Sequence, residues 1–141
     1  EIFQFPLEKF ILTFDDGYVD HYKSFEKFLK IPTQKIYFIT CGWIGRPEFL
    51  SVAQIKYMNS YENISFGAHS FSHQDLNELN IESKIKFIEE DTIKTCEWFN
   101  KNLGFVPTAF CYPNNNAAYG ITLKFYKNTD LLNFMVGKEL P

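Results

Sequence analysis

Two spacings of apolar residues alternate along the chain. Short runs rich in β-branched and aromatic residues are typical of buried strands, and they lie at residues 9–14, 35–40, 63–68, 108–112 and 131–136. Between them, apolar residues recur at the spacing of amphipathic helices, at residues 19–30, 51–60, 81–103 and 117–126. Gly120 and Thr122 interrupt the last of these helices. The alternation predicts an α/β fold with a parallel sheet and right-handed crossovers.

The chain is predicted to form a single domain that spans residues 1–141. Its length is sufficient for a sizeable core, and 45% of its residues are apolar and 18% aromatic, enough to fill one. No internal repeat, low-complexity tract or linker divides the sequence.

Polar residues follow three of the predicted strands directly, and they are Asp15 and Asp16, His69 and His73, and Tyr112, Pro113 and Asn114. The carboxyl ends of parallel strands meet at one edge of a sheet or barrel, and functional residues gather there. The sequence therefore predicts that these side chains share one rim.

Asp15 and Asp16 are adjacent carboxylates at the end of an apolar run. Like charges side by side need a positive group nearby, and Arg46 is the only arginine in the chain. A metal ion is therefore the better partner. His69 and His73 have the i, i+4 spacing that lets two imidazoles hold one metal if the segment turns helically.

One carboxylate and two histidines leave open positions on a metal, which suits a hydrolytic zinc or a non-haem iron centre. A zinc-type ion lowers the pKa of its bound water to roughly 7, and the second aspartate can then act as the general base. A non-haem iron oxygenase is a weaker alternative, because both histidines follow one strand. A haloacid-dehalogenase-type phosphatase needs a spacer between its two aspartates, which Asp15 and Asp16 lack.

Charge narrows the classes of partner. The formal net charge of −3 argues against a nucleic-acid partner, which requires a clustered positive surface. The acidic run Glu89-Glu90-Asp91 is assigned to the solvated face of the 81–103 helix. No apolar run reaches the ~20 residues that a transmembrane helix requires.

Cysteine content and the first residue bear on localisation. Cys41, Cys96 and Cys111 are widely spaced and form no CxxC pair, so they are predicted to be free thiols of a reducing compartment. No signal peptide is visible, which slightly favours a cytoplasmic location. Because the chain begins at Glu1 without a methionine, a secreted or cell-envelope location stays open.

Three stretches carry a family resemblance. Thr13-Phe14-Asp15-Asp16-Gly17 looks like the first motif of the polysaccharide deacetylases (carbohydrate esterase family 4, the NodB homology domain), and His69-Ser70-Phe71-Ser72-His73 looks like their second motif, His-Ser/Thr-x-x-His. Phe110-Cys111-Tyr112-Pro113 resembles the third motif in the form found in the Phe-x-Tyr-Pro branch. The order and spacing of these motifs match the family over nearly the whole chain.

The resemblance implies a distorted (β/α) barrel that removes an acetyl group from an N-acetylated sugar or polysaccharide. It implies one divalent metal ion as cofactor, usually zinc, with iron, cobalt or nickel as alternatives. Asp16, His69 and His73 would hold the metal, a metal-bound water would be the nucleophile, and Asp15 would be the general base. The division of roles between the two aspartates comes from the family alone.

The resemblance also implies residues that contact the substrate. The backbone N–H of Asn114 would help to stabilise the oxyanion, and Tyr112 and Pro113 would line the sugar site. Trp43 lies in the loop after the second predicted strand, on the same rim. It could stack on a sugar face or pack over the core.

Two features depart from the family pattern. Cys111 stands where many members have an arginine that contacts the catalytic aspartate, and Asn114-Asn115-Asn116 replaces an aromatic-glycine continuation. The family's late histidine, which protonates the leaving amine, has no counterpart before Pro141, and His21 is predicted to be a solvated helix residue. A catalytically degenerate protein that binds carbohydrate or metal without turnover is therefore the alternative function.

About five parallel strands are too few to close a barrel of the usual kind. We therefore expect an incomplete (β/α) barrel of the NodB type, with the domain truncated at its C-terminus or a partner covering its open edge. An apolar fifth strand at that edge favours dimerisation, so a homodimer that covers it is one prediction.

Overall fold

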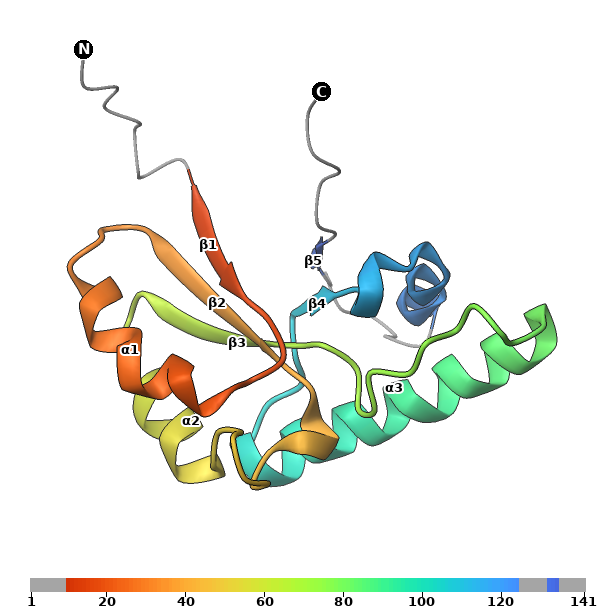
Figure 1. Ribbon diagram of the computed structural model, residues 1–141, viewed down its shortest axis with the longest axis horizontal. Coiled ribbons are helices and arrows are strands. Elements are labelled where there is room, and N and C mark those ends of the chain that lie inside the picture. The colour runs from red at the N-terminus through yellow and green to blue at the C-terminus, as the bar shows by residue number, and fades with distance from the viewer. Residues whose placement is uncertain (1–9, 125–131, 135–141) are drawn as a thin grey trace, which may run out of the picture.

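The computed structural model describes residues 10–124 and 132–134. Five strands form one parallel sheet in the order β1-β2-β3-β4-β5. They are β1 (Ile11–Phe14), β2 (Gln34–Ile39), β3 (Ile64–Ala68), β4 (Ala109–Cys111) and β5 (Leu132–Phe134). The sheet curls, so the strand direction turns steadily from β1 to β3 (Figure 1). The predicted incomplete (β/α) barrel is confirmed.

Three α-helices connect the strands, and they are α1 (Val19–Leu29), α2 (Val52–Asn59) and α3 (Ile81–Leu103). Ser51 and Gln54 start α2 with a reciprocal capping box, which satisfies two backbone N–H groups at the helix end. Asn80 accepts the N–H of Ser83 at the start of α3, and Gly104 ends that helix in the left-handed conformation that glycine tolerates best.

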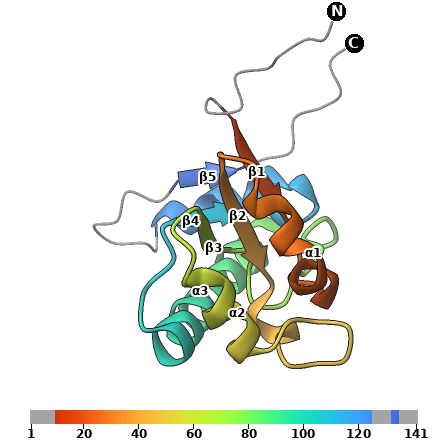
Figure 2. The ribbon, with the colours of Figure 1, turned by 90° about the vertical axis from the view of Figure 1, so that its left-hand side faces the viewer.

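The helices cover one face of the curled sheet (Figure 2). Alternate strand residues point to opposite faces, and those facing the helices build most of the core. This core joins strand residues Tyr37, Ile39, Phe66, Ala68 and Phe110 to helix residues Phe25, Ile55, Met58, Ile88 and Phe99. The opposite face carries a smaller cluster of Ile36, Phe38, Ala109 and Cys111. Cys111 therefore points away from the helices.

The strand register aligns the carboxyl ends that position the site. Phe14 pairs with Tyr37, and Ile39 pairs with Ala68. A single pair, Ala68 with Phe110, joins β3 to β4. The chain thus leaves β1, β3 and β4 along one rim, as the strand pattern predicted.

The segment after β4 differs from the prediction. The helix expected over residues 117–126 is a 3-10 helix, η4 (Ala117–Lys124), and residues 125–126 lie outside the described part. Two shorter 3-10 helices precede it in the chain, η2 (Cys41–Trp43) and η3 (Pro113–Asn115). Asn116 accepts the N–H of Ala118 at its start, and Gly120 weakens an α-helix at its centre.

The remaining expectations on the fold concern the last strand and the membrane. Residues 132–134 confirm the centre of the strand predicted over 131–136, and its other residues lie outside the described part. Among the described helices, none combines the length and the apolar character needed to cross a bilayer.

Candidate metal centre

The carboxyl ends of β1, β3 and β4 border one pocket. It has a volume of about 430 Å³, and its lining residues are Asp15, Asp16, His69, His73, Tyr112, Asn114 and Asn115. All of these except Asn115 were predicted site residues. The structure brings together side chains that lie as far apart in the sequence as Asp15 and Asn114.

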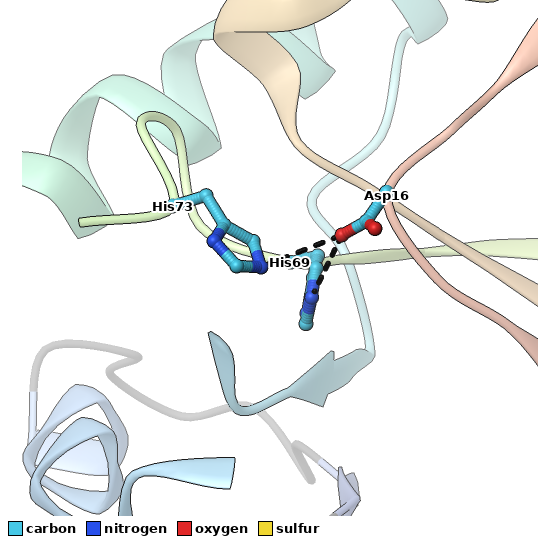
Figure 3. Close-up of side chains that lie close together, drawn as sticks. All are labelled: Asp16, His69 and His73. Atoms are coloured by element: carbon cyan, nitrogen blue, oxygen red, sulfur yellow. Dashed lines mark ion pairs between the residues drawn. The ribbon is translucent and has the colours of Figure 1, made fainter. Parts of the chain in front are cut away.

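Asp16 lies between the two histidines (Figure 3). Its Oδ1 is 3.3 Å from Nε2 of His69 and 3.4 Å from Nε2 of His73. The backbone reaches this position through two successive positive φ angles, 76° at Asp16 and 89° at Gly17. Aspartate tolerates the left-handed conformation better than most residues, so the Asp-Gly pair suits a turn that aims the Asp16 carboxylate at the end of β3.

His69 is held by the neighbouring strand. Its side chain is buried, and its Nδ1 lies 2.9 Å from the carbonyl oxygen of Cys111. Because a carbonyl can only accept, Nδ1 must donate, and Nε2 of the neutral imidazole then carries a lone pair. That lone pair faces an oxygen of Asp16 at 3.3 Å. A cation between these two atoms, either a proton or a metal ion, would interact favourably with both.

The three side chains fit a divalent metal ion. One ligand atom from each of Asp16, His69 and His73 lies within 4.8 Å of the other two, and no other such group occurs in the described ranges. Around a tetrahedral zinc with bonds of about 2.0–2.1 Å, neighbouring ligand atoms lie about 3.3 Å apart. Asp16 Oδ1 has nearly this separation from both imidazoles.

The histidine loop is not helical, which corrects one expectation. Ser70 and His73 have positive φ angles of 64° and 56°, and residues 69–73 contain no helix. The Ser70 hydroxyl accepts the backbone N–H of His73 at 2.8 Å. The two rings therefore converge through a compact loop, with centroids 4.8 Å apart, and not through the i, i+4 geometry of a helix.

The pKa shifts favour the protonation states that a metal needs. When His69 is protonated, its Nε2–H donates to Asp16 and, together with the charges of the histidines, lowers the pKa of Asp16, although partial burial opposes the shift. Burial, followed by the proximity of His69, lowers the pKa of His73. An ionised carboxylate and a neutral imidazole are the forms that bind a metal.

Asp15 faces a different neighbour from Asp16. Its Oδ2 is 3.6 Å from the Sγ of Cys111, within reach of the thiol hydrogen. Burial and the Asp15 charge raise the pKa of Cys111 to about 12, so this thiol stays protonated and donates. Asp15 Oδ1 is buried and accepts no hydrogen bond within the described residues. One oxygen of Asp15 is therefore held by the thiol, while the other accepts no hydrogen bond from the described residues.

The predicted substrate contacts divide into two groups. Tyr112 and Asn114 line the pocket, and Asn114 has a positive φ of 53°. Pro113 is buried and does not line it. The Trp43 ring stacks on His73 with centroids 5.1 Å apart, so Trp43 packs on a candidate metal ligand. That Pro113 and Trp43 contact substrate stays a prediction.

Two residues differ from their expected surroundings. His21 is partly buried against the rings of Phe14, Tyr18 and Tyr37 and is not a solvated helix residue. Asp91 is 6% exposed and is not on a solvated face.

The spacing of residues along α3 could have predicted that Asp91 is buried. Ile88, Asp91, Thr92, Thr95 and Phe99 are its buried residues, and this i, i+3, i+4, i+7 spacing is that of one helix face. The acidic run of residues 89–91 obscured that phase.

The sequence matches the family model described as polysaccharide deacetylase over residues 5–131. The chain therefore belongs to the polysaccharide deacetylase family. No curated protein matches it. Its membership of the Phe-x-Tyr-Pro branch stays a prediction.

Solved structures share the fold. The structure of IcaB from Ammonifex degensii has a TM-score of 0.67 and 23% identity, over 81% of this chain and 55% of that one. A de-N-acetylase from Aggregatibacter actinomycetemcomitans has a TM-score of 0.72 and 15% identity, over 92% and 63%. BA3943 from Bacillus anthracis, a carbohydrate esterase family 4 pseudoenzyme, has a TM-score of 0.66 and 18% identity, over 93% of this chain and 44% of that one. This chain thus spans about half the length of the structures it matches.

Proposed function

We propose that this chain is a metal-dependent hydrolase that removes an acetyl group from an N-acetylated sugar or polysaccharide. Membership of the polysaccharide deacetylase family supports the reaction class. The observation that carries the metal dependence is the position of Asp16 Oδ1, 3.3 and 3.4 Å from two imidazole nitrogens in a pocket that also contains Asp15.

Asp16, His69 and His73 are the proposed ligands, and zinc is the proposed ion, with iron, cobalt or nickel as alternatives. A divalent ion in this position would lower the pKa of a coordinated water to roughly 7 and polarise the amide carbonyl of the substrate. The buried carbonyl of Cys111 keeps His69 in the tautomer that offers Nε2, which is the usual supporting contact of a metal-binding histidine.

Asp15 is the proposed general base. It is adjacent to the ligand Asp16 but contacts Cys111 instead of the histidines, so it keeps its carboxylate for the attacking water. The water proton passes to Asp15, the oxygen attacks the amide carbon, and the carbon–nitrogen bond breaks to give acetate and a free amine.

The leaving nitrogen must gain a proton. Apart from Asp15 and the three proposed ligands, no carboxylate or histidine lines the described pocket. Asp15, which has taken a proton from the attacking water, is the proposed donor and returns that proton to the nitrogen. Asp15 would thus act as a general base towards the attacking water and as a general acid towards the leaving nitrogen.

Asn114 and Tyr112 are the proposed contacts of the acetyl group and the sugar. Asn114 lines the pocket, and its backbone N–H is the proposed donor to the developing oxyanion. Tyr112 lines the same pocket and is the proposed contact of the sugar.

A degenerate protein that binds metal or carbohydrate without turnover is the second candidate. Asp15 has a thiol rather than a cationic side chain beside it, and the described pocket has no separate acid. A fold neighbour, BA3943, is itself a pseudoenzyme. These observations motivate the alternative and leave the metal site intact in both cases.

Free-amine release separates the two candidates. Metal-free protein would be reconstituted with Zn²⁺ or Co²⁺ and incubated with N-acetylglucosamine oligomers. Hydrolysis that disappears with a chelator and returns with metal supports the enzyme. Metal binding without any amine release favours the degenerate protein, and hydrolysis in the absence of metal contradicts the proposed mechanism.

A further inference from the structure

A buried carboxylate lies beneath the histidine loop. Asp91 projects from α3 towards the segment that follows β3, which dips to the helix at this point (Figure 1). Its Oδ1 accepts the backbone N–H of Phe71 at 2.8 Å, and its Oδ2 accepts the N–H of Ser72 at 3.2 Å and the Ser72 hydroxyl at 2.8 Å. One side chain thus accepts three hydrogen bonds from the two residues that precede His73.

The loop needs such support because its conformation is unfavourable by itself. Ser70 and His73 flank Phe71 and Ser72, and both have positive φ angles. Residues other than glycine avoid this conformation unless surrounding contacts hold it. Residues 69–73 form no helix, so no intrahelical hydrogen bonds satisfy their backbone N–H groups.

The other side of the loop is held by backbone groups. The N–H of Cys41 donates to the Ser70 carbonyl at 3.2 Å, and the N–H of Gly42 donates to the Phe71 carbonyl at 2.8 Å. A Cβ at Gly42 would come within 2.6 Å of the Phe71 oxygen, so the two segments are in close contact. The loop carbonyls therefore bind η2, while Asp91 binds the N–H groups of Phe71 and Ser72.

We propose that Asp91 is a positioning residue of the metal centre. By binding Phe71 and Ser72, it fixes the loop between the two histidines and so sets His73 at the distance from Asp16 and His69 that one ion requires. This inference rests on the proposed metal-dependent function. Asp91 does not line the metal pocket and touches neither substrate nor ion.

Cobalt binding tests the role without relying on activity. Metal-free wild-type protein and the Asp91→Asn, Ser72→Ala and Glu89→Gln variants would be titrated with Co²⁺, with the visible spectrum reporting coordination and chelator competition giving Kd. The amide –NH2 of Asp91→Asn faces the backbone N–H of Ser72, which cannot accept a hydrogen bond, while the Ser72 hydroxyl can rotate to accept one. Glu89→Gln changes an exposed carboxylate on the same helix and serves as the control.

Asp91→Asn should raise Kd about 10–100-fold, the usual effect of removing a supporting contact of a metal ligand, and should alter the visible spectrum. Ser72→Ala should raise Kd about 2–10-fold, as expected for one lost hydrogen bond. Glu89→Gln should stay within about twofold of wild type. If Asp91→Asn does not fold, Ser72→Ala decides the question.

The outcomes separate this inference from the proposed function. If wild-type protein binds Co²⁺ and both loop variants keep its Kd and spectrum, the positioning role is wrong while the metal site stands. A lowered melting temperature with unchanged Kd also contradicts the positioning role, because it assigns Asp91 to the scaffold only. If the wild type binds no Co²⁺, the proposed metal site itself is contradicted, and the positioning role with it.

Discussion

Gly67 allows close packing of the strands next to the proposed metal centre. It lies in β3, two residues before His69, and a Cβ added there would come within 2.6 and 2.7 Å of the Phe38 ring and 2.9 Å of the Ala109 carbonyl oxygen. Gly67→Ala therefore forces either the ring or β4 to move. Phe38 is fully buried, so its ring has little room, and displacement of β4 is the expected response.

The cost follows from these distances. Carbon–carbon contacts are most favourable at about 3.5–4.0 Å, so the new methyl group demands a shift of roughly 1 Å in close-packed surroundings. Overpacking of this kind destabilises by about 1–3 kcal/mol, which lowers the melting temperature by roughly 3–12 °C for a domain of this size. Because Ala68 with Phe110 is the one β3–β4 pair, the shift also moves the Cys111 carbonyl away from His69.

The assay is chemical denaturation of metal-free protein, together with Co²⁺ affinity. Ser65→Ala is the matched control, because Ser65 lies in the same strand but is exposed, and it should change stability by less than about 0.5 kcal/mol. Gly67→Ala should lower both stability and metal affinity. A variant as stable as Ser65→Ala with wild-type affinity would refute the packing argument.

Three further predictions concern single side chains. Burial outweighs the charges of nearby aspartates and lowers the pKa of His21 below its usual 6.5. The unfolded chain therefore binds a proton more tightly than the folded one, and the stability falls as the pH drops below about 6.5. In urea denaturation at pH about 5 to 7, His21→Phe should flatten this dependence, and an unchanged slope would contradict the argument. Cys111→Ala removes the thiol beside Asp15 but keeps the backbone carbonyl that holds His69. Steady-state assays should find hydrolysis about 2–10-fold slower and an unaltered Co²⁺ affinity. Weaker Co²⁺ binding would contradict these separate roles of the thiol and the carbonyl. Trp43→Ala removes the ring stacked on His73 and should weaken Co²⁺ binding about 2–10-fold; if only the KM for substrate rises, Trp43 contacts sugar instead.

Much of the site could be predicted from the sequence because strand ends determine it. Asp16 and His69 follow apolar runs whose length and composition identify buried strands, and parallel topology brings such ends together. The lining of one pocket by Asp15, Asp16, His69 and His73 agrees with that expectation. Local pattern and global topology point to the same rim, so short-range information was sufficient there.

The conformation of the histidine loop could not be predicted in the same way. The spacing of His69 and His73 is compatible with a helix, but hydrogen bonds from η2 and α3 stabilise left-handed residues at Ser70 and His73. The partners of Asp91 could not be predicted for the same reason, because they lie about twenty residues away in sequence. Tertiary contacts outweigh local propensity at both positions.

The most direct test of the central claim compares wild-type protein with Asp15→Asn for metal content and free-amine release. The account predicts about one divalent ion per chain in both proteins, hydrolysis of N-acetylglucosamine oligomers by the wild type, and a loss of about 10²–10⁴-fold in Asp15→Asn, the usual contribution of a general base. Undiminished hydrolysis by Asp15→Asn, or hydrolysis by protein stripped of metal, would contradict it.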